Sequence, residues 1–374
     1  MILIGTDGGI YRWSEGAGWP VFHSLQDHAI TALASPSLGV LVALDGTGQV
    51  FESLNNGQDW RVIPMAEGIG KPTTLGAWGH PATIVAGTRS LHLARRPVGA
   101  PIPIHREAWG TGEQGGSSGL LSRAWTLAGD ATALLTARRR TDTVKADRAT
   151  ASLAGWTRLG SPTAEKGKKK GQASEIQTLA AEEGSPAWWF ATVKENGLWR
   201  SHDRGANWQQ CPGLPSEVNM VRPIAGKPGT VYAATSNGCW LSTDSGQTWE
   251  ERSGGLDQAR SVTTITANPR DPNALLAGAG TPRSDEINAF PLEGVRSSLY
   301  ESKDGGKTWS LVRRGNPDVL VNDTIADIQH DPNVPEFILM ALTSGELWVT
   351  RNGGAYWVPL SRQIRAVRTL CPIA

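Results

Sequence analysis

The segments NGLWRSHDRGANWQQ (196–210), NGCWLSTDSGQTWEE (237–251) and SSLYESKDGGKTWSL (297–311) are three copies of one unit. Weaker copies are GGIYRWSEGAGWPV (8–21), GQVFESLNNGQDWRV (48–62) and GELWVTRNGGAYWVP (345–359). Self-similarity at a period of roughly 20 to 50 residues is typical of solenoids, propellers and other repeat architectures. The repeat therefore decides the fold class.

Eight tryptophans close the units and set their boundaries. They are Trp19, Trp60, Trp109, Trp156, Trp208, Trp249, Trp309 and Trp357, at spacings of 41, 49, 47, 52, 41, 60 and 48 residues. Each unit also carries apolar and β-branched runs bounded by Gly, Asn, Asp and Pro, such as ITALASPS (30–37) and GVLVALDGTG (39–48). Such runs are typical of short strands. The pattern predicts four strands in each unit.

Tight turns are expected between the second and third strands of several units. The dipeptides at these points are Asp7-Gly8, Asp45-Gly46, Asn196-Gly197, Asn237-Gly238 and Ser344-Gly345. Gly and Asn accept the positive φ that a type I′ hairpin turn requires. These dipeptides therefore predict antiparallel hairpins.

A four-stranded meander of this length cannot bury both of its faces alone, and radial stacking of such sheets gives a β-propeller. The sequence predicts an all-β fold with a single propeller over residues 1–374, of eight blades, with seven as the alternative. The first unit lacks an opening strand, and the C-terminal segment AVRTLCPIA (366–374) has the pattern of one. We therefore expect the C-terminal strand to pair with the N-terminal blade and remove two exposed edges. Long loops are expected at 110–124, 160–175 and 279–298.

The composition suits a folded core and excludes several classes of protein. The 374 residues include 16 Trp and 44 Gly, and the formal net charge is only +1. No run of 18 apolar residues predicts a membrane-spanning helix, and the start MILIGTDGG lacks the features of a secretory signal. Cys211, Cys239 and Cys371 form no CxxC pair, so we expect buried thiols. The expected location is the cytoplasm.

The pattern Ser/Thr-x-Asp-x-Gly-x-x-Trp resembles the Asp-box, also called the bacterial neuraminidase repeat, of sialidase-like propellers. Full matches are Ser201-Asp203-Gly205-Trp208, Ser242-Asp244-Gly246-Trp249 and Ser302-Asp304-Gly306-Trp309, and Asn55 and Asn352 replace the acid in two more. In that family the boxes are structural turns between the third and fourth strands, away from the ligand face. The resemblance implies that the acid accepts backbone hydrogen bonds, the Gly takes a left-handed step and the Trp buries its ring.

Sialidase chemistry is not expected. The family needs an early Arg-Ile-Pro, whereas this chain has only Arg222-Pro223-Ile224, and its four tyrosines all occupy repeat positions. Other hydrolases on propellers use two carboxylates. Acids expected on turns of the ligand face are Asp7, Asp45, Glu195, Asp285 and Glu286, although Asp7 and Asp45 also suit a purely structural turn. Seven scattered histidines and the stretch GTGEQGGSSG (110–119) match no metal or phosphate motif, so no metal or cofactor is expected.

Positive charge is concentrated in one part of the chain. Residues 87–171 hold 15 Lys and Arg against 6 Asp and Glu, a net of +9. The basic residues include Arg95, Arg96, Arg138, Arg139, Arg140, Lys145, Arg148, Lys166, Lys168, Lys169 and Lys170. The lysine run also suits a solvated loop tip. The 279–298 loop carries Asp285, Glu286 and Phe290, so we hypothesise an asymmetric binding face with a basic and an acidic side.

A noncatalytic propeller that binds a protein partner is the leading expectation, with an anionic surface as a further partner class. Nucleic acid is not expected, because few aromatic residues interleave with the basic ones. The chain is similar to the single-propeller photosystem II assembly and stability factors and their bacterial relatives, which implies a scaffold or assembly role. Those relatives usually have seven blades, so eight is a departure. The alternative is a carbohydrate-binding or glycoside-cleaving propeller with acidic residues at its central opening.

Overall fold

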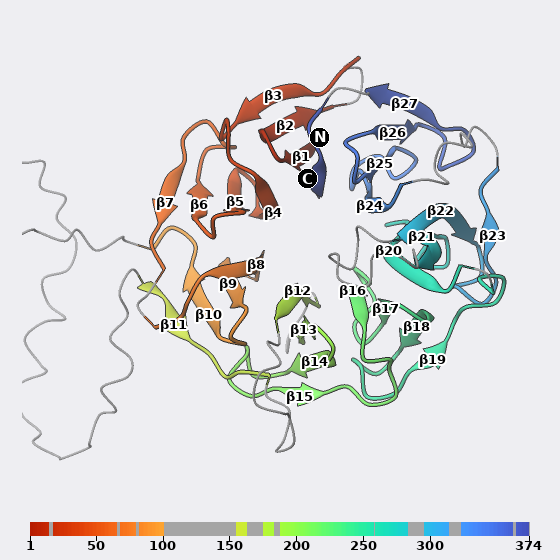
Figure 1. The fold of residues 1–374 in the computed structure, drawn as a ribbon, viewed down its shortest axis with the longest axis horizontal. Helices are drawn as coiled ribbons and strands as arrows, with labels where there is room; N and C mark the ends of the chain where they lie inside the picture. The colour runs from red at the N-terminus through yellow and green to blue at the C-terminus, as the bar shows by residue number, and fades with distance from the viewer. Residues whose placement is uncertain are drawn as a thin grey trace, which may run out of the picture. The chain divides into compact units, whose positions relative to one another are not determined.

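The structure is a computed structural model that describes residues 1–14, 18–65, 68–79, 82–100, 155–162, 175–182, 188–257, 259–282, 295–313, 323–361 and 364–373. These residues belong to one compact unit, spanning 1–102 and 152–374, and contain 28 strands and no α-helix. No helix of this described part is long and apolar enough to cross a membrane. The strands form seven four-stranded antiparallel sheets, called blades 1 to 7 below (Figure 1).

Blade 1 contains β28 (Val367–Pro372), β1 (Ile2–Thr6), β2 (Gly9–Trp13) and β3 (Val21–Ser24), in order from the inside outward. Blade 2 contains β4 (Ile30–Ser37), β5 (Val40–Asp45), β6 (Val50–Ser53) and β7 (Arg61–Ile63). Blade 3 contains β8 (Pro72–Trp78), β9 (Thr83–Thr88), β10 (Leu93–Pro97) and β11 (Thr157–Arg158). Blade 4 contains β12 (Ile176–Ala181), β13 (Trp189–Val193), β14 (Gly197–Ser201) and β15 (Gln209–Gln210).

Blade 5 contains β16 (Val218–Pro223), β17 (Val231–Thr235), β18 (Gly238–Ser242) and β19 (Glu250–Glu251). Blade 6 contains β20 (Ser261–Ala267), β21 (Leu275–Pro282), β22 (Val295–Ser302) and β23 (Ser310–Leu311). Blade 7 contains β24 (Ile325–His330), β25 (Ile338–Leu342), β26 (Leu347–Thr350) and β27 (Val358–Ser361).

The predicted count of eight blades is wrong, and the error lies in blade 3. Its third strand β10 pairs with β11, so the chain between them, residues 98–156, belongs to one blade and contains a long insertion ahead of Trp156. The insertion is longer than one repeat, and Trp109 lies inside it at a spacing that imitates a unit boundary. Trp156 is the closing tryptophan of blade 3: its ring is fully buried and its indole N–H donates to the Pro64 carbonyl of blade 2 at 3.0 Å.

The C-terminal strand completes blade 1. β28 pairs antiparallel with β1 over Ile2 to Thr6, which makes it the inner strand of that blade. The inner strands then contact one another in the cyclic order β28, β4, β8, β12, β16, β20, β24 and back to β28. The ring closes by backbone pairing between the first and last strands, as the sequence predicts.

Side chains from one blade satisfy backbone groups on the inner edge of the next. Asn219 of blade 5 donates to the Val262 carbonyl of blade 6 at 2.7 Å, and Thr263 of blade 6 donates to the Ile325 carbonyl of blade 7 at 3.1 Å. Asp327 of blade 7 accepts from the Leu370 amide of β28 at 3.1 Å. Inner-edge backbone groups would otherwise stay unpaired, so these contacts help to join successive blades.

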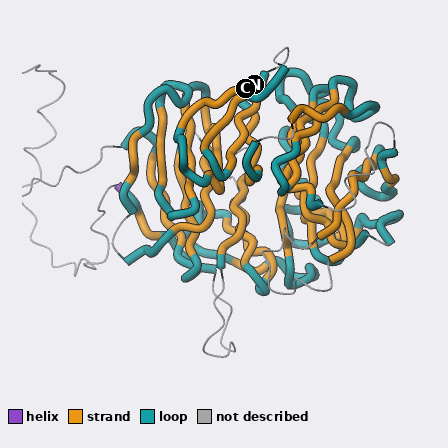
Figure 2. The backbone as a smooth tube through the Cα atoms, turned by 45° about the horizontal axis from the view of Figure 1, so that its top comes forward, coloured by secondary structure: helices purple, strands orange, loops and turns teal. Residues whose placement is uncertain are grey.

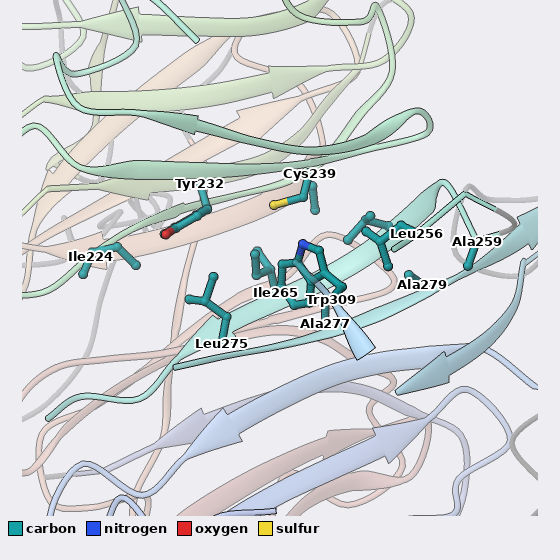
Figure 3. Packing of buried hydrophobic residues seen from close by; sticks show 12 residues of the cluster. Ile224, Tyr232, Cys239, Leu256, Ala259, Ile265, Leu275, Ala277, Ala279 and Trp309 are labelled. Atoms are coloured by element: carbon teal, nitrogen blue, oxygen red, sulfur yellow. The ribbon is translucent and has the colours of Figure 1, made fainter. Parts of the chain in front are cut away.

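Seven hydrophobic clusters form the core, one between each pair of adjacent blades. Between blades 5 and 6, for example, Tyr232 and Cys239 face Ile265, Leu275 and Trp309 (Figure 3). Each blade is therefore apolar on both faces, because both faces are covered by neighbouring sheets. The alternation of buried strands with polar turns follows from this stacking.

Turns gather at the two ends of the strands (Figure 2). At one end, here called the turn face, the second-to-third-strand turns meet the connections between blades, as where the Gly197 amide donates to the Ser216 carbonyl at 2.8 Å. At the other end, the box face, the third-to-fourth-strand turns meet the first-to-second-strand turns, as where the Ser245 amide donates to the Gly229 carbonyl at 2.9 Å.

Candidate functional site

The three full Asp-boxes are closed hydrogen-bonded turns on the box face. In the first, the Ser201 hydroxyl donates to Asp203 Oδ1 at 2.8 Å and accepts from the Gly205 amide at 2.8 Å. Asn207 donates to the same carboxylate through its backbone amide at 2.8 Å and its side chain at 2.7 Å. The acids of the other two boxes, Asp244 and Asp304, accept in the same way from Thr248 and Thr308.

These hydrogen bonds keep the box carboxylates ionised. Desolvation raises the pKa of Asp203, but donors on Asn207 and Ser201 and the nearby His202 lower it more, to about 2. The pKa of Asp244 is also about 2, because its donors outweigh its desolvation, and donors from Thr308 lower that of Asp304 to about 2. All three carboxylates are occupied as turn acceptors, which fits the structural role and not proton donation.

The acids expected on the turn face are engaged where the structure describes them. Asp7 accepts from Arg368 Nε at 3.0 Å and Nη2 at 3.2 Å. Glu195 is exposed at a turn tip, where it has a positive φ of 56°. Asp285, Glu286 and Phe290 lie outside the described residues.

Asp45 is buried and forms a pair that sequence reasoning missed. It accepts from the amides of Thr47 and Gln49 at 2.9 and 2.8 Å, from the Thr47 hydroxyl at 2.6 Å, and lies 2.9 Å from His28 Nδ1. Desolvation raises the pKa of Asp45, whereas these hydrogen bonds lower it below its ordinary value. The carboxylate orients the His28 ring, which also packs edge-on against Phe51 with ring centroids 4.9 Å apart. No sequence motif links the two residues, which lie 17 positions apart on separate turns.

The first two basic candidates lie on β10, at the base of the insertion. Arg95 is half-buried, while the Arg96 side chain is completely buried. Arg96 Nη1 lies 3.8 Å from Glu52 Oε1, and Glu52, also completely buried, pairs on its other side with Arg61. Arg96 is therefore an internal cation of the blade 2–blade 3 boundary and not an exposed partner contact.

This Glu52–Arg61–Arg96 cluster holds the chain on the N-terminal side of the insertion. The Gly99 amide donates to Glu52 Oε1 at 2.8 Å, and Arg61 and Arg96 both donate to the Ala100 carbonyl. On the other side, a Cβ placed on Gly155 would lie 3.6 Å from Ala100 Cβ, so the two ends of the insertion meet. The cluster was missed because Glu52 occupies a third-strand position that holds Arg200, Leu241, Glu301 or Val349 in other blades.

The remaining basic candidates, Arg138, Arg139, Arg140, Lys145 and Arg148, lie outside the described residues, as do the four lysines between 166 and 170. The segment that carries 138–148 leaves and re-enters the propeller between a third and a fourth strand, at the box face. The segment that carries Asp285 joins the second strand β21 to the third strand β22, at the turn face. The two insertions therefore begin at opposite ends of the strands, so their stems do not support the single asymmetric face expected from sequence.

Within the described ranges, no three His, Cys, Asp or Glu side chains are grouped so that they could hold a metal ion. The three cysteines are buried, and desolvation raises the pKa of each thiol to about 12.

Comparisons with known proteins agree on the propeller. A family model described as sortilin, neurotensin receptor 3, matches residues 196–315, and a comparison with curated proteins gave no match. The chain is similar to a glycoside hydrolase family 74 xyloglucanase from Xanthomonas campestris, at 17% identity and a TM-score of 0.61, over 96% of this chain and 52% of that one. It thus spans about half the length of that enzyme.

Two further similar structures are YCF48 proteins. One was solved bound to D1 peptide, with 13% identity and a TM-score of 0.54, over 95% of this chain and 87% of that one. The other is from Cyanidioschyzon merolae, with 12% identity and a TM-score of 0.56, over 93% and 90%. At these identities the likeness shows a shared β-propeller architecture.

Proposed function

We propose that this chain is a noncatalytic cytoplasmic propeller of the sialidase-like superfamily that binds a protein partner, as a scaffold or assembly factor, through the basic insertion of blade 3. The observation that carries the proposal is the stem of that insertion. Blade 3 keeps its closing Trp156 buried while the chain between its third and fourth strands is lengthened and clamped by Glu52, Arg61 and Arg96.

A buried ion cluster is a costly way to close a blade boundary. Well-packed apolar side chains of similar volume are often as stabilising or more so, because two charges must be removed from water. The other described blades carry no such cluster at the same third-strand position, where Leu241 and Val349 suffice. The cluster therefore suits the task of fixing where the inserted segment leaves the propeller.

The sequence of the insertion supplies the chemistry of recognition. Arg138, Arg139 and Arg140 are consecutive, with Lys145 and Arg148 close by in sequence. Arginine forms bidentate hydrogen bonds with carboxylates, so an acidic protein surface is the complementary partner. The YCF48 structure bound to D1 peptide, which resembles this chain over most of both lengths, supports peptide or protein binding as the type of function.

Glycoside cleavage has weaker support. It requires a pair of carboxylates about 5 to 10 Å apart, one of them able to donate a proton. Asp7 is paired with Arg368, and Asp45 is held ionised by four neighbouring donors. The likeness to the xyloglucanase is one of fold over half of that enzyme.

Charge reversal of Arg138, Arg139 and Arg140 to glutamate tests the proposal. The tagged chain would be purified from its native host and its partners quantified by mass spectrometry. A matched control reverses three exposed cations on Asp-box turns of the same box face, Arg204, Lys303 and Lys307. We expect the first variant to lose its specific partner at least tenfold and the control to retain it. Equal recovery with both variants would refute the proposed sector.

A further inference from the structure

Blade 1 exposes apolar side chains along its outer edge, at β3, the strand farthest from the inner strand β28. The exposed fractions are 64% for Trp19, 53% for Val21 and 42% for Phe22. Tyr11 of β2 packs edge-on against Phe22, with ring centroids 5.6 Å apart. These four residues, with Tyr11 and Phe22 on one face of the sheet and Val21 on the other, are called the blade 1 edge patch. Contiguous exposed apolar side chains on a folded domain mark interaction surfaces more often than isolated ones do.

The outer strands of the other blades provide an internal comparison. Those of blades 3 to 6 have two residues each, with the sequences Thr-Arg, Gln-Gln, Glu-Glu and Ser-Leu. The outer strand of blade 7 contains Pro359, which has no N–H to offer, and in blade 2 Arg61 is held by Glu52. Short strands, charges and prolines are the usual devices that keep sheet edges from pairing. β3 is four residues long and has no charged residue or proline within it, although Pro20 precedes it and its register with β2 shifts between Ile10 and Tyr11.

The tryptophan rule of the repeat is also broken in blade 1. Trp156, Trp309 and Trp357 are buried, and the indoles of Trp60 and Trp208 donate to the carbonyls of their own box glycines at 3.1 Å. By strand register Pro20 holds the equivalent position in blade 1, because it directly precedes Val21, which pairs with Arg12 as Arg61 pairs with Glu52 in blade 2. Trp19 lies one residue earlier and is 64% exposed. Blade 1 therefore has no tryptophan at the closing position, and the neighbouring Trp19 is turned to the surface.

The edge is held in place before any partner arrives. β3 pairs with β2 through Tyr11 with Phe22 and Arg12 with Val21. His23 Nε2 hydrogen-bonds with the Asn56 carbonyl of blade 2 at 2.9 Å, which fixes the end of the strand. Successive residues of an antiparallel strand direct their N–H and C=O alternately toward and away from the paired strand. Among the residues that the structure describes, β3 is the last strand of its sheet, so its outward backbone groups face no further described strand.

We propose that β3 binds an extended segment of a partner protein, which adds as a fifth strand to blade 1. Backbone hydrogen bonds to the edge supply affinity, and side chains on the two faces of the added strand supply selectivity. On the face of Tyr11 and Phe22 the segment presents an apolar side chain. On the face of Val21 and the exposed Arg12 the adjacent residue is acidic, because it meets a positive charge.

The size of the patch favours a short segment over a second folded copy of the chain. An aromatic side chain buries roughly 150 to 250 Å² when fully covered, so Trp19 and Phe22 offer about 250 Å² together at their exposed fractions. A stable interface between folded proteins needs about 800 Å² on each partner. An extended segment can bind with less area, because the sheet edge adds hydrogen bonds.

Selection of random heptapeptides displayed on phage against the immobilised full chain tests this inference. Enriched peptides are synthesised with a fluorescein label, and their affinity is measured by anisotropy. We expect alternating peptides with adjacent apolar and acidic residues, and new protection in hydrogen exchange of the outward-facing amides within 21–24 when peptide is bound. Phe22→Lys should weaken binding at least tenfold. The matched control Val62→Lys, on the outer strand of blade 2 and 43% exposed, should not change it.

Three results would overturn the inference. One is the absence of any peptide whose binding depends on Phe22. A second is equal binding of the same peptide after N-methylation of its alternate amides in either register, which would indicate apolar adhesion without strand pairing. The third is a concentration-dependent dimer in sedimentation that Phe22→Lys abolishes, because a second copy would then cover the patch. The inference is independent of the proposed function, since the Arg138–Arg140 variant leaves β3 unchanged.

Discussion

Replacement of Glu52 by glutamine is expected to destabilise the propeller strongly, although only one atom in the side chain changes. Glu52 and Arg96 are both completely buried, and Arg61, the second cation of the cluster, is about one third exposed. Burial lowers the pKa of Arg96 and the charge of Glu52 raises it, but a guanidinium stays protonated at any ordinary pH. The variant therefore leaves a buried cation without its anion.

The magnitude follows from this geometry. Removal of one partner from a buried ion pair costs about 3 to 5 kcal/mol, because the remaining charge keeps its desolvation penalty. Glutamine retains one acceptor oxygen for the Gly99 amide or an arginine, so we expect the lower end, about 3 kcal/mol. At about 2 °C per kcal/mol for a chain of this size, the Tm should fall by about 6 °C.

The assay is urea unfolding followed by tryptophan fluorescence, with thermal melts in parallel. Glu301→Gln is the matched control: it occupies the same third-strand position in blade 6, pairs only loosely with Lys303 at 3.9 Å, and is partly exposed. Its effect should stay below about 0.5 kcal/mol. The double variant Glu52→Gln, Arg96→Met should recover about 2 kcal/mol, since the orphaned charge is gone. A loss below 1 kcal/mol for Glu52→Gln, or strict additivity in the double variant, would refute the reasoning.

Three further predictions concern the Asp-boxes and the thiols. The pKa values of Asp203, Asp244 and Asp304 are about 2 in the folded chain against 3.8 for a free side chain. The stability that these carboxylates contribute is therefore complete above about pH 4 and is lost as the pH falls through about 2. Urea midpoints measured between pH 5 and 2 should show this decline, and the variant with all three acids replaced by Asn should flatten it. Arg204 has a φ of 58° at the box position where blade 6 has Gly305 at 71°. Because glycine takes this left-handed conformation without strain, Arg204→Gly should raise the free energy of unfolding by about 0.5 to 1 kcal/mol, and Gly305→Ala should lower it by about 1 kcal/mol. Opposite signs in urea titrations would contradict a left-handed step at this position. Burial raises the pKa values of Cys211, Cys239 and Cys371 to about 12. A thiol reagent at pH 8 should therefore label none of them in the native chain and all three in urea. Labelling of the native chain would argue against the blade packing around these cysteines.

The repeat predicted the local structure of the blades well. Four strands, a hairpin turn and an Asp-box each depend on residues close in sequence, so the signal for them is local. Closure by the C-terminal strand was also predictable, because the first unit visibly lacks a strand that 366–374 supplies. Closure follows because a first blade without its opening strand would leave two exposed sheet edges.

The blade count was not predictable by spacing alone. The box of blade 3 has no Asp-box residues to set the phase, and Trp109 divides the 96 residues between Trp60 and Trp156 into two intervals close to one repeat. Only the pairing of β10 with β11 shows that both intervals belong to one blade. Sequence periodicity cannot distinguish an inserted segment from a degenerate repeat of the same length.

The candidate site was harder to predict because its contacts join distant turns. Arg96 was chosen as a surface cation by charge, yet its surroundings are set by Glu52, which is 44 positions away on another blade. His28 and Asp45 meet because two turn-face loops converge. The exposure of Trp19 is likewise invisible in sequence, where it resembles the other closing tryptophans.

Excision of residues 101–154, with Ala100 joined to Gly155 through two glycines, tests the central claim most directly. This segment lies between the third and fourth strands of one blade in a complete seven-bladed ring, and Gly155 lies next to Ala100. The shortened chain should fold as a monomer, keep its near-ultraviolet circular dichroism and Tm within about 5 °C, and lose capture of the protein partner. An unfolded or aggregated product would show that the segment is an integral part of the ring, and undiminished capture would show that it is not the binding sector.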